Sequence, residues 1–143
     1  MSESNTKLAR IANELLIGQF HRHVLLCVGD ACCNDVGKKA AQAAWDALKD
    51  ALKARGLSLA TGPLACYRTK VGCLRVCAGG PILVVYPEGL WYAGMTADRI
   101  ERFVQEHLVD GRPIEEWVFA RNPLPTAAEK QARAADDADR NAD

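Results

Sequence analysis

The sequence predicts an α/β domain in which a small mixed β-sheet packs against flanking helices. Two short apolar segments, residues 23–28 and 82–86, are typical of buried strands, because each is bounded by glycine or proline. Helical spacing of apolar residues follows each of them, over residues 36–55 and again between Thr96 and Gly111. The resulting order of a helix, a β-α-β unit and a β-β-α unit gives a mixed sheet if the crossover is right-handed.

The first half of the chain is expected to contain two helices around the first strand. Residues 6–18 carry apolar side chains at the spacing of a short amphipathic helix. Asn34 and Asp35 are the predicted N-cap residues of the helix over 36–55, and Gly56 provides its C-terminal stop. The predicted apolar face of that helix consists of Ala41, Ala44, Trp45, Leu48 and Leu52.

The second half is expected to supply the remaining strands and the last helix of the domain. A strand is predicted over 64–69, followed by a glycine-rich loop over 71–81. Residues 87–89 are the turn of a hairpin whose second strand covers 90–93, and 114–119 form a short ordered segment. The apolar face of the last helix consists of Ile100, Phe103, Val104 and Leu108.

Length and composition indicate one soluble domain with two short extensions. The chain has 143 residues, of which 49% are apolar and 25% charged, as in ordinary globular proteins. We expect a helical N-terminal extension over residues 1–20 and a folded domain over 21–121. Residues 122–143 are rich in alanine and acidic residues and lack aromatic ones, which predicts a flexible tail.

Charge and hydropathy exclude several kinds of partner. Eighteen basic residues balance eighteen acidic ones, and no basic run is interleaved with aromatic residues, so no nucleic-acid partner is expected. No stretch has the length of a membrane span, and the N-terminus lacks the features of a secretory signal. We therefore expect no membrane partner and a cytoplasmic location, where six cysteines indicate metal or redox chemistry instead of disulfides.

Four of the cysteines form two short pairs, Cys27 with Cys32 and Cys73 with Cys77. The first pair is at the end of the predicted strand 23–28, and the second lies in the loop before the strand over 82–86. If these strands are antiparallel, both loops open at the same end of the sheet. Because thiolates are soft ligands, the spacing favours zinc, cuprous copper or an iron–sulfur cluster near the surface.

The other candidate residues have simpler interpretations. Cys33 follows Cys32 directly and could compete for its place, but we interpret it as a spare thiol beside the site. Cys66 lies in a predicted strand and is interpreted as a small buried hydrophobic residue. His107 is interpreted as an ordinary surface or capping histidine.

The cysteine motifs and the segments around them resemble one known family. Val24-Leu-Leu-Cys27-x4-Cys32, Val71-Gly-Cys-Leu-Arg-Val-Cys-Ala-Gly-Gly-Pro81 and Val84-Val-Tyr-Pro-Glu-Gly-Leu-Trp-Tyr92 are similar to the thioredoxin-like [2Fe-2S] ferredoxins. The spacing also resembles that of the small iron–sulfur subunit of NADH dehydrogenases, and the likeness covers roughly residues 22–119. It implies a thioredoxin-like fold, often dimeric, with one [2Fe-2S] cluster bound by Cys27, Cys32, Cys73 and Cys77.

Three functions follow from these patterns. The resemblance implies a carrier of single electrons that is not an enzyme and meets redox partner proteins, a reductase and an electron acceptor; it also implies a homodimer. The first alternative is a structural zinc site with four cysteine ligands, which the two spacings permit. The second is thiol–disulfide exchange, although such enzymes usually carry C-x-x-C at a helix N-terminus, a motif that the sequence lacks.

Overall fold

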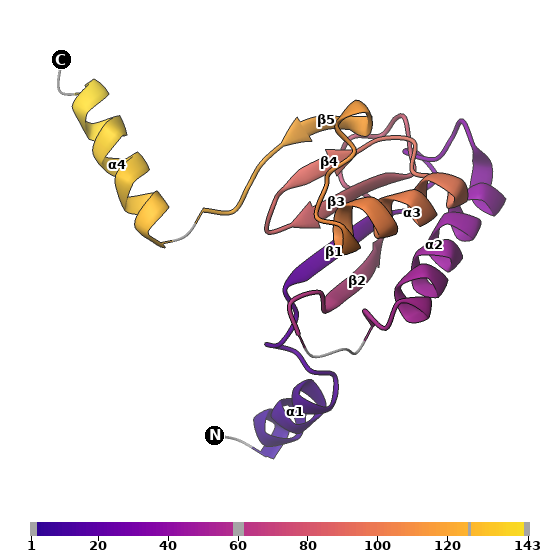
Figure 1. Ribbon diagram of the computed structural model, residues 1–143, viewed down its shortest axis with the longest axis horizontal. Coiled ribbons are helices and arrows are strands. Elements are labelled where there is room, and N and C mark those ends of the chain that lie inside the picture. The colour runs from indigo at the N-terminus through magenta and orange to yellow at the C-terminus, as the bar shows by residue number, and fades with distance from the viewer. Residues whose placement is uncertain (1–2, 59–61, 126, 142–143) are drawn as a thin grey trace.

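The computed structural model describes residues 3–58, 62–125 and 127–141. Its centre is a five-stranded sheet in the order β2-β1-β3-β4-β5 (Figure 1), in which β1 and β2 are parallel and the other neighbours antiparallel. The strands are β1 (Arg22–Cys27), β2 (Cys66–Val71), β3 (Ile82–Tyr86), β4 (Leu90–Tyr92) and β5 (Val118–Arg121). The predicted mixed α/β architecture is confirmed, with β2 shifted by two residues from the expected 64–69.

Two helices cover one face of the sheet. The helical elements are α1 (Glu3–Glu14), α2 (Gly37–Ala54), α3 (Ala97–Phe103), the π-helical η1 (Val104–Val109), the 3-10 helix η2 (Glu115–Trp117) and α4 (Ala127–Asn141). Helices α2 and α3 pack on the same face, whereas α1 and α4 extend away from the sheet (Figure 1). Both β1 and β3, at the centre of the sheet, therefore lie beneath the α2–α3 layer.

The core lies between the apolar faces of these helices and the strand side chains that point to them. Val24 and Leu26 of β1 and Leu83 and Val85 of β3 point to the helices, because alternate residues of a strand share a face. The helices contribute Ala44, Leu48, Ala51, Leu52, Ile100, Phe103, Val104 and Leu108. The predicted apolar faces are thus confirmed, except that Trp45 is only half-buried at the margin of the core.

The start of α2 differs from the prediction that Asn34 and Asp35 cap it. The N-cap position is Val36, and no side chain makes a capping hydrogen bond there. The amide of Gly37 instead donates to the carbonyl oxygen of Cys33 at 2.8 Å, so the preceding residues form hydrogen-bonded backbone turns. These turns satisfy the first amide groups of the helix without a polar side chain, which is why the prediction was wrong.

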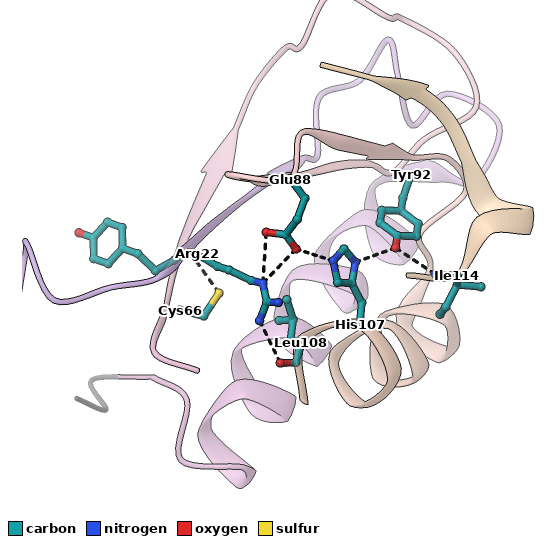
Figure 2. A network of polar contacts seen from close by, with 8 residues as sticks. Arg22, Cys66, Glu88, Tyr92, His107, Leu108 and Ile114 are labelled. Atoms are coloured by element: carbon teal, nitrogen blue, oxygen red, sulfur yellow. Dashed lines mark hydrogen bonds and ion pairs between the residues drawn. The ribbon is translucent and has the colours of Figure 1, made fainter. Parts of the chain in front are cut away.

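A buried polar network ties together the end of the sheet at which β1 begins (Figure 2). Arg22 Nε lies 3.0 Å from Glu88 Oε2, and the same oxygen lies 2.6 Å from His107 Nε2. On the other side of the imidazole, His107 Nδ1 lies 2.7 Å from the Tyr92 hydroxyl, which accepts a hydrogen bond from the amide of Ile114 at 3.2 Å. Because the hydroxyl oxygen accepts from that amide, its own proton is free to point to Nδ1, and Nε2 then donates to the carboxylate.

The burial of His107 contradicts its interpretation as a surface or capping residue. Its side chain is 1% exposed and lies on η1, among the aromatic rings of Tyr92 and Phe103. The residue occupies the position that continues the apolar series of the last helix, four residues after Phe103. This apolar periodicity is the sequence signal that marks residue 107 as buried. The role of the histidine depends on its two partners, Glu88 and Tyr92, which are distant in the sequence.

The two terminal helices contribute nothing to the core. No residue of α1 is buried, and the side chains described in α4 are exposed. Among the described residues, no helix combines the length and apolar character needed to cross a membrane. The expected extensions over 1–20 and 122–143 include residues outside the described ranges, and the domain boundaries stay a prediction.

Candidate functional site

The first cysteine pair is buried at the end of β1. Cys27 is the last residue of that strand, Cys32 lies in the loop that leads to α2, and their Sγ atoms are 2.8 Å apart. Neither side chain is more than 4% exposed. Cys33 is also buried, with its Sγ 3.4 Å from that of Cys32. One loop thus gathers three sulfur atoms in a small volume below the surface.

The second pair lies on the surface, in the loop over 72–81. Cys73 and Cys77 are both exposed, and the amide of Arg75 donates to Cys73 Sγ at 3.2 Å. Arg75 and Cys77 have φ values of 69° and 59°, in the left-handed region that side chains other than glycine rarely adopt. Such strained backbone is concentrated at functional sites, where the surrounding structure holds it in place.

The sheet topology brings the two loops to the same place. In the sheet, Cys27 pairs with Val71 of β2 on one side and with Ile82 of β3 on the other. The loop over 72–81 connects these two neighbours and therefore passes across the end of β1 that carries Cys27. The predicted convergence of the two loops at one end of the sheet is confirmed. A hydrogen bond from the Gly80 amide to the Cys32 carbonyl oxygen, 2.7 Å long, joins them directly.

Two glycines allow the loops to approach this closely. A Cβ atom added to Gly29 would overlap the carbonyl oxygen of Gly72, and one added to Gly80 would overlap the carbonyl of Cys32. A Cβ on Gly72 itself would meet no atom within 4 Å. The contact thus requires the absence of a side chain on one partner of each pair, as close backbone approaches usually do.

Known proteins are similar to this chain in both sequence and structure. It is 29% identical over 107 residues to a 2Fe-2S ferredoxin of Aquifex aeolicus, which spans 73% of this chain and 94% of that protein. The structure of a thioredoxin-like [2Fe-2S] ferredoxin from Aquifex aeolicus matches with a TM-score of 0.59 at 25% identity, over 74% of this chain and 96% of the other. The chain resembles the thioredoxin-like [2Fe-2S] ferredoxins in both sequence and fold.

A further relative shows the same similarity. A putative 2Fe-2S ferredoxin of Priestia megaterium is 34% identical over 94 residues, which are 66% of each chain. No family model matches the sequence. The resemblance stated from the cysteine motifs is confirmed by similarity that extends over 66% to 74% of this chain.

The donor set of this site fits a binuclear iron–sulfur cluster. Such a cluster is held by four cysteine thiolates, two on each iron. One pair comes from the end of β1 and the loop after it, and the other pair comes from the loop over 72–81. The four predicted residues could serve as two pairs of ligands, one pair on each iron.

Burial and neighbouring charge raise the pKa of thiols in this site. Desolvation raises the pKa of Cys27, while hydrogen bonds from the backbone at Gly29 and Leu74 act in the opposite direction. The pKa of Cys77 is also raised, first by the neighbouring charge of Cys73 and in smaller part by the charge of Cys27. Metal binding requires cysteine in its deprotonated form, so a bound cationic centre would act against the raised pKa of Cys27 and Cys77.

The remaining cysteine lies apart from this site. Cys66 begins β2 at the opposite end of the sheet and is 1% exposed. Burial raises the pKa of its thiol to about 12, so it stays protonated at any physiological pH. The expectation that Cys66 is a small buried hydrophobic residue is confirmed.

Proposed function

We propose that this chain is a carrier of single electrons that binds one [2Fe-2S] cluster through Cys27, Cys32, Cys73 and Cys77. The observation that supports this most is the course of the loop over 72–81, which crosses the end of β1 and brings an exposed cysteine pair to a buried one. When bound, the cluster would supply the one-electron chemistry. The ligand roles rest on the pairing of the cysteines and on the similarity to thioredoxin-like [2Fe-2S] ferredoxins.

The protein part of the site has two tasks in this proposal. The buried loop shields Cys27 and Cys32 from water, while backbone amides such as those of Gly29, Leu74 and Arg75 point to sulfur atoms. Hydrogen bonds to sulfur and exposure to solvent are the features that tune the potential of such sites. The exposed pair leaves one side open, so that a partner can come close for electron transfer. The chain therefore acts as a carrier between a reductase and an electron acceptor and is not itself an enzyme.

The test is direct. Protein purified without oxygen should be red-brown and contain equal amounts of iron and inorganic sulfide, two of each per chain. Reduction with dithionite should produce an electron paramagnetic resonance signal of one unpaired electron per chain. A colourless protein that contains one zinc ion per chain would contradict the proposal, and so would disulfide reductase activity that survives complete removal of iron.

Each alternative has an observation against it. Thiol–disulfide exchange uses a cysteine whose pKa is lowered, commonly at a helix N-terminus. Here burial raises the pKa of Cys27, Cys32 and Cys33. Against a structural zinc site stands the similarity of this chain to proteins named 2Fe-2S ferredoxins.

Three further features belong to the proposal. We infer a homodimer, supported by the sheet face opposite α2 and α3, which carries half-buried Leu25 and Trp91 and adjoins exposed Phe119. We place the protein in the cytoplasm, where thiols stay reduced. The folded domain extends over residues 21–121, with extensions before and after it. Sedimentation of the cluster-containing protein tests the dimer.

A further inference from the structure

We propose that the buried cysteine pair is a modification site: when the chain holds no cluster, a peroxide converts the thiols of Cys27 and Cys32 into a disulfide. The disulfide then keeps the site closed to iron until a reductant cleaves it. This inference rests on the proposed function, because it assigns a second chemistry to two of the proposed ligands. The positions of three sulfur atoms, and the backbone that holds them, support it.

A tight turn brings Cys32 back to the end of β1. The amide of Cys33 donates to the carbonyl oxygen of Gly29 at 3.1 Å, and the amide of Gly80 donates to the carbonyl oxygen of Cys32 at 2.7 Å. The Sγ atom of Cys32 lies 3.5 Å from the carbonyl oxygens of both Cys27 and Gly29. The backbone around Cys32 is thus held in place, and its side chain points to Cys27.

The sulfur atoms of Cys27 and Cys32 are already close to bonding distance. Their separation of 2.8 Å is only about 0.8 Å longer than a disulfide bond, which measures about 2.05 Å. Groups that a fold holds this close react far faster than the same groups free in solution, because no further ordering is needed. A shift of this size requires only small rotations of the two side chains.

The third sulfur atom, that of Cys33, is a poorer partner for Cys32. It lies 3.4 Å from the Sγ of Cys32, farther than the sulfur of Cys27 does. The peptide bond between Cys32 and Cys33 is trans, which places their Cα atoms about 3.8 Å apart. Disulfide-bonded residues usually have Cα atoms about 4.4 to 6.8 Å apart. The bond therefore forms between Cys27 and Cys32 and leaves Cys33 as a free thiol.

The reaction consumes one peroxide molecule and needs no other reactant. The sulfur of one cysteine attacks a peroxide oxygen, which gives a sulfenic acid and one water molecule. The sulfur of the other cysteine then attacks the sulfenic sulfur, and its thiol proton leaves with the hydroxyl group as a second water molecule. A dithiol reductant reverses the change, because it returns two hydrogen atoms to the sulfurs and itself becomes a disulfide.

The disulfide changes what the site can bind. Cysteine binds a metal as a thiolate, and the two sulfurs of a disulfide are no longer thiolates. The oxidised chain would therefore offer iron only the exposed pair, Cys73 and Cys77. A bound cluster would engage the sulfurs of Cys27 and Cys32, so the modification belongs to the cluster-free chain. Burial favours the product, because a disulfide carries no charge and a thiolate does.

A double variant isolates the buried pair for the test. Cys73→Ser/Cys77→Ser lacks the exposed ligands and should hold no cluster, and it keeps four of the six cysteines. One equivalent of hydrogen peroxide should lower its mass by about 2 Da, the mass of two hydrogen atoms. Two thiols should then remain that react with iodoacetamide after unfolding. A mass that stays constant, or that only rises through added oxygen, would overturn the proposal.

Peptide mapping identifies the bonded residues. A protease that cleaves before aspartate cuts at Asp30 and so separates Cys27 from Cys32 and Cys33. The two fragments should stay joined until a reductant is added. A bond between Cys32 and Cys33 would leave the fragments separate, and that result would overturn the proposal.

Single substitutions added to the double variant provide a matched pair. Cys32→Ser and Cys33→Ser each replace one buried sulfur by oxygen at neighbouring positions of the same turn. After peroxide treatment, the Cys33→Ser protein should still lose about 2 Da, whereas the Cys32→Ser protein should not. Disulfide formation in the Cys32→Ser protein, or its failure in the Cys33→Ser protein, would contradict the assignment of the bond.

The parent chain separates a failure of this inference from a failure of the proposed function. Cluster-free parent protein that has been reduced should take up ferrous iron and sulfide, whereas the peroxide-treated protein should take up almost none until a dithiol is added. If the reduced protein binds no cluster, the proposed function fails, and the mass and the peptide map still decide whether the disulfide forms. If it loads normally but the double variant keeps all four thiols after peroxide, the inference fails and the proposed function stands.

Discussion

At the scale of single residues, Gly29 and Gly72 lie in contact, but only Gly72 has room for a side chain. A Cβ atom on Gly29 would overlap the Gly72 carbonyl, whereas a Cβ on Gly72 would point into open space. We therefore expect Gly29→Ala to push the two cysteine loops apart and to lower the iron content strongly, with a blue- or red-shifted visible spectrum in what remains. Gly72→Ala is the matched control and should load normally. Iron and sulfide analysis of both variants checks this.

The cysteines should separate into ligands and bystanders. Cys77→Ala should abolish assembly of the cluster, because the exposed loop then offers only one thiolate. Cys66→Ala should leave the visible spectrum intact and cost about 1 kcal/mol of unfolding free energy, since it only removes a small buried group. Bleaching of the Cys66 variant would show that the ligand set is wrong.

Cys33 requires a separate experiment because its sulfur is so close to that of Cys32. Cys27 Sγ is 2.8 Å from Cys32 Sγ, and the Cys33 sulfur lies next to Cys32 instead of between the two. We expect Cys33→Ser to keep its cluster and its colour. Cys32→Ser should change the absorption and electron paramagnetic resonance spectra. The reverse result in the two variants would assign the ligand role to Cys33.

Among single residues, the sequence predicted best those whose residue type itself determines their chemistry, such as the cysteines. The two cysteine pairs and buried Cys66 could be recognised from spacing and local pattern. The role of His107 could not, because a histidine within an apolar series is read as polar unless its partners are known. Glu88 and Tyr92 come from a distant hairpin, and only the folded sheet places them on either side of the imidazole.

At the scale of elements, the Arg22–Glu88–His107 network holds η1 against the hairpin between β3 and β4. Burial would raise the pKa of Glu88, but the hydrogen bond with His107 and the charge of Arg22 together bring the pKa below its usual value. A lowered pKa in the folded state means that the contribution to stability is complete above the ordinary glutamate pKa. It is lost as the pH falls through the folded-state value.

The lowered pKa of Glu88 predicts how a substitution should change stability with pH. Glu88→Gln should be less stable than the parent protein by about 1–3 kcal/mol at neutral pH, because Arg22 and His107 lose a charged acceptor. The difference should shrink as the pH is lowered below the ordinary glutamate range. Urea unfolding as a function of pH measures it. A constant difference at every pH would exclude the carboxylate as the source.

The ends of elements were predicted less well than the elements themselves. The strands over 23–28 and 82–86 shift by no more than one residue at either end, because apolar runs between turn residues are a strong signal. The start of α2 was predicted to within one residue, but its capping residues were predicted wrongly because backbone turns replace them. The buried residues of the π-helical η1 are Val104, His107 and Leu108, whose spacing is also that of an α-helix, so apolar spacing did not reveal it.

At the scale of the whole molecule, the domain boundaries make a prediction about truncation. The chain beyond β5 is still attached to the domain at Leu124, whose amide donates to the Pro87 carbonyl at 3.0 Å, but the side chains described in α4 are exposed. A protein that ends at Pro125 should therefore keep its thermal midpoint and its visible spectrum. A protein that ends at Pro113 lacks β5 and should lose stability clearly. Calorimetry of both proteins tests the boundary.

The overall architecture could be predicted because two constraints act together. The parallel pair β1–β2 follows from the β-α-β order with a right-handed crossover, and the antiparallel orientation of β1 and β3 was the condition under which both cysteine loops open at one end of the sheet. The position of β5 beside β4 and the close approach of Gly29 to Gly72 could not be predicted. Both depend on how the sheet twists and packs, which local patterns do not encode.

The hydrogen bond between Gly80 and Cys32 also bears on how the protein matures in the cell. Its two residues are far apart in the sequence, and the binding loops meet only when β1 has both β2 and β3 beside it. The four predicted ligands therefore come together only in the paired strands, and a cluster would bind the folded chain in preference to the unfolded one. Cluster binding would stabilise the folded sheet, including its edge strand β2. It would thereby protect the loaded protein from unfolding and proteolysis.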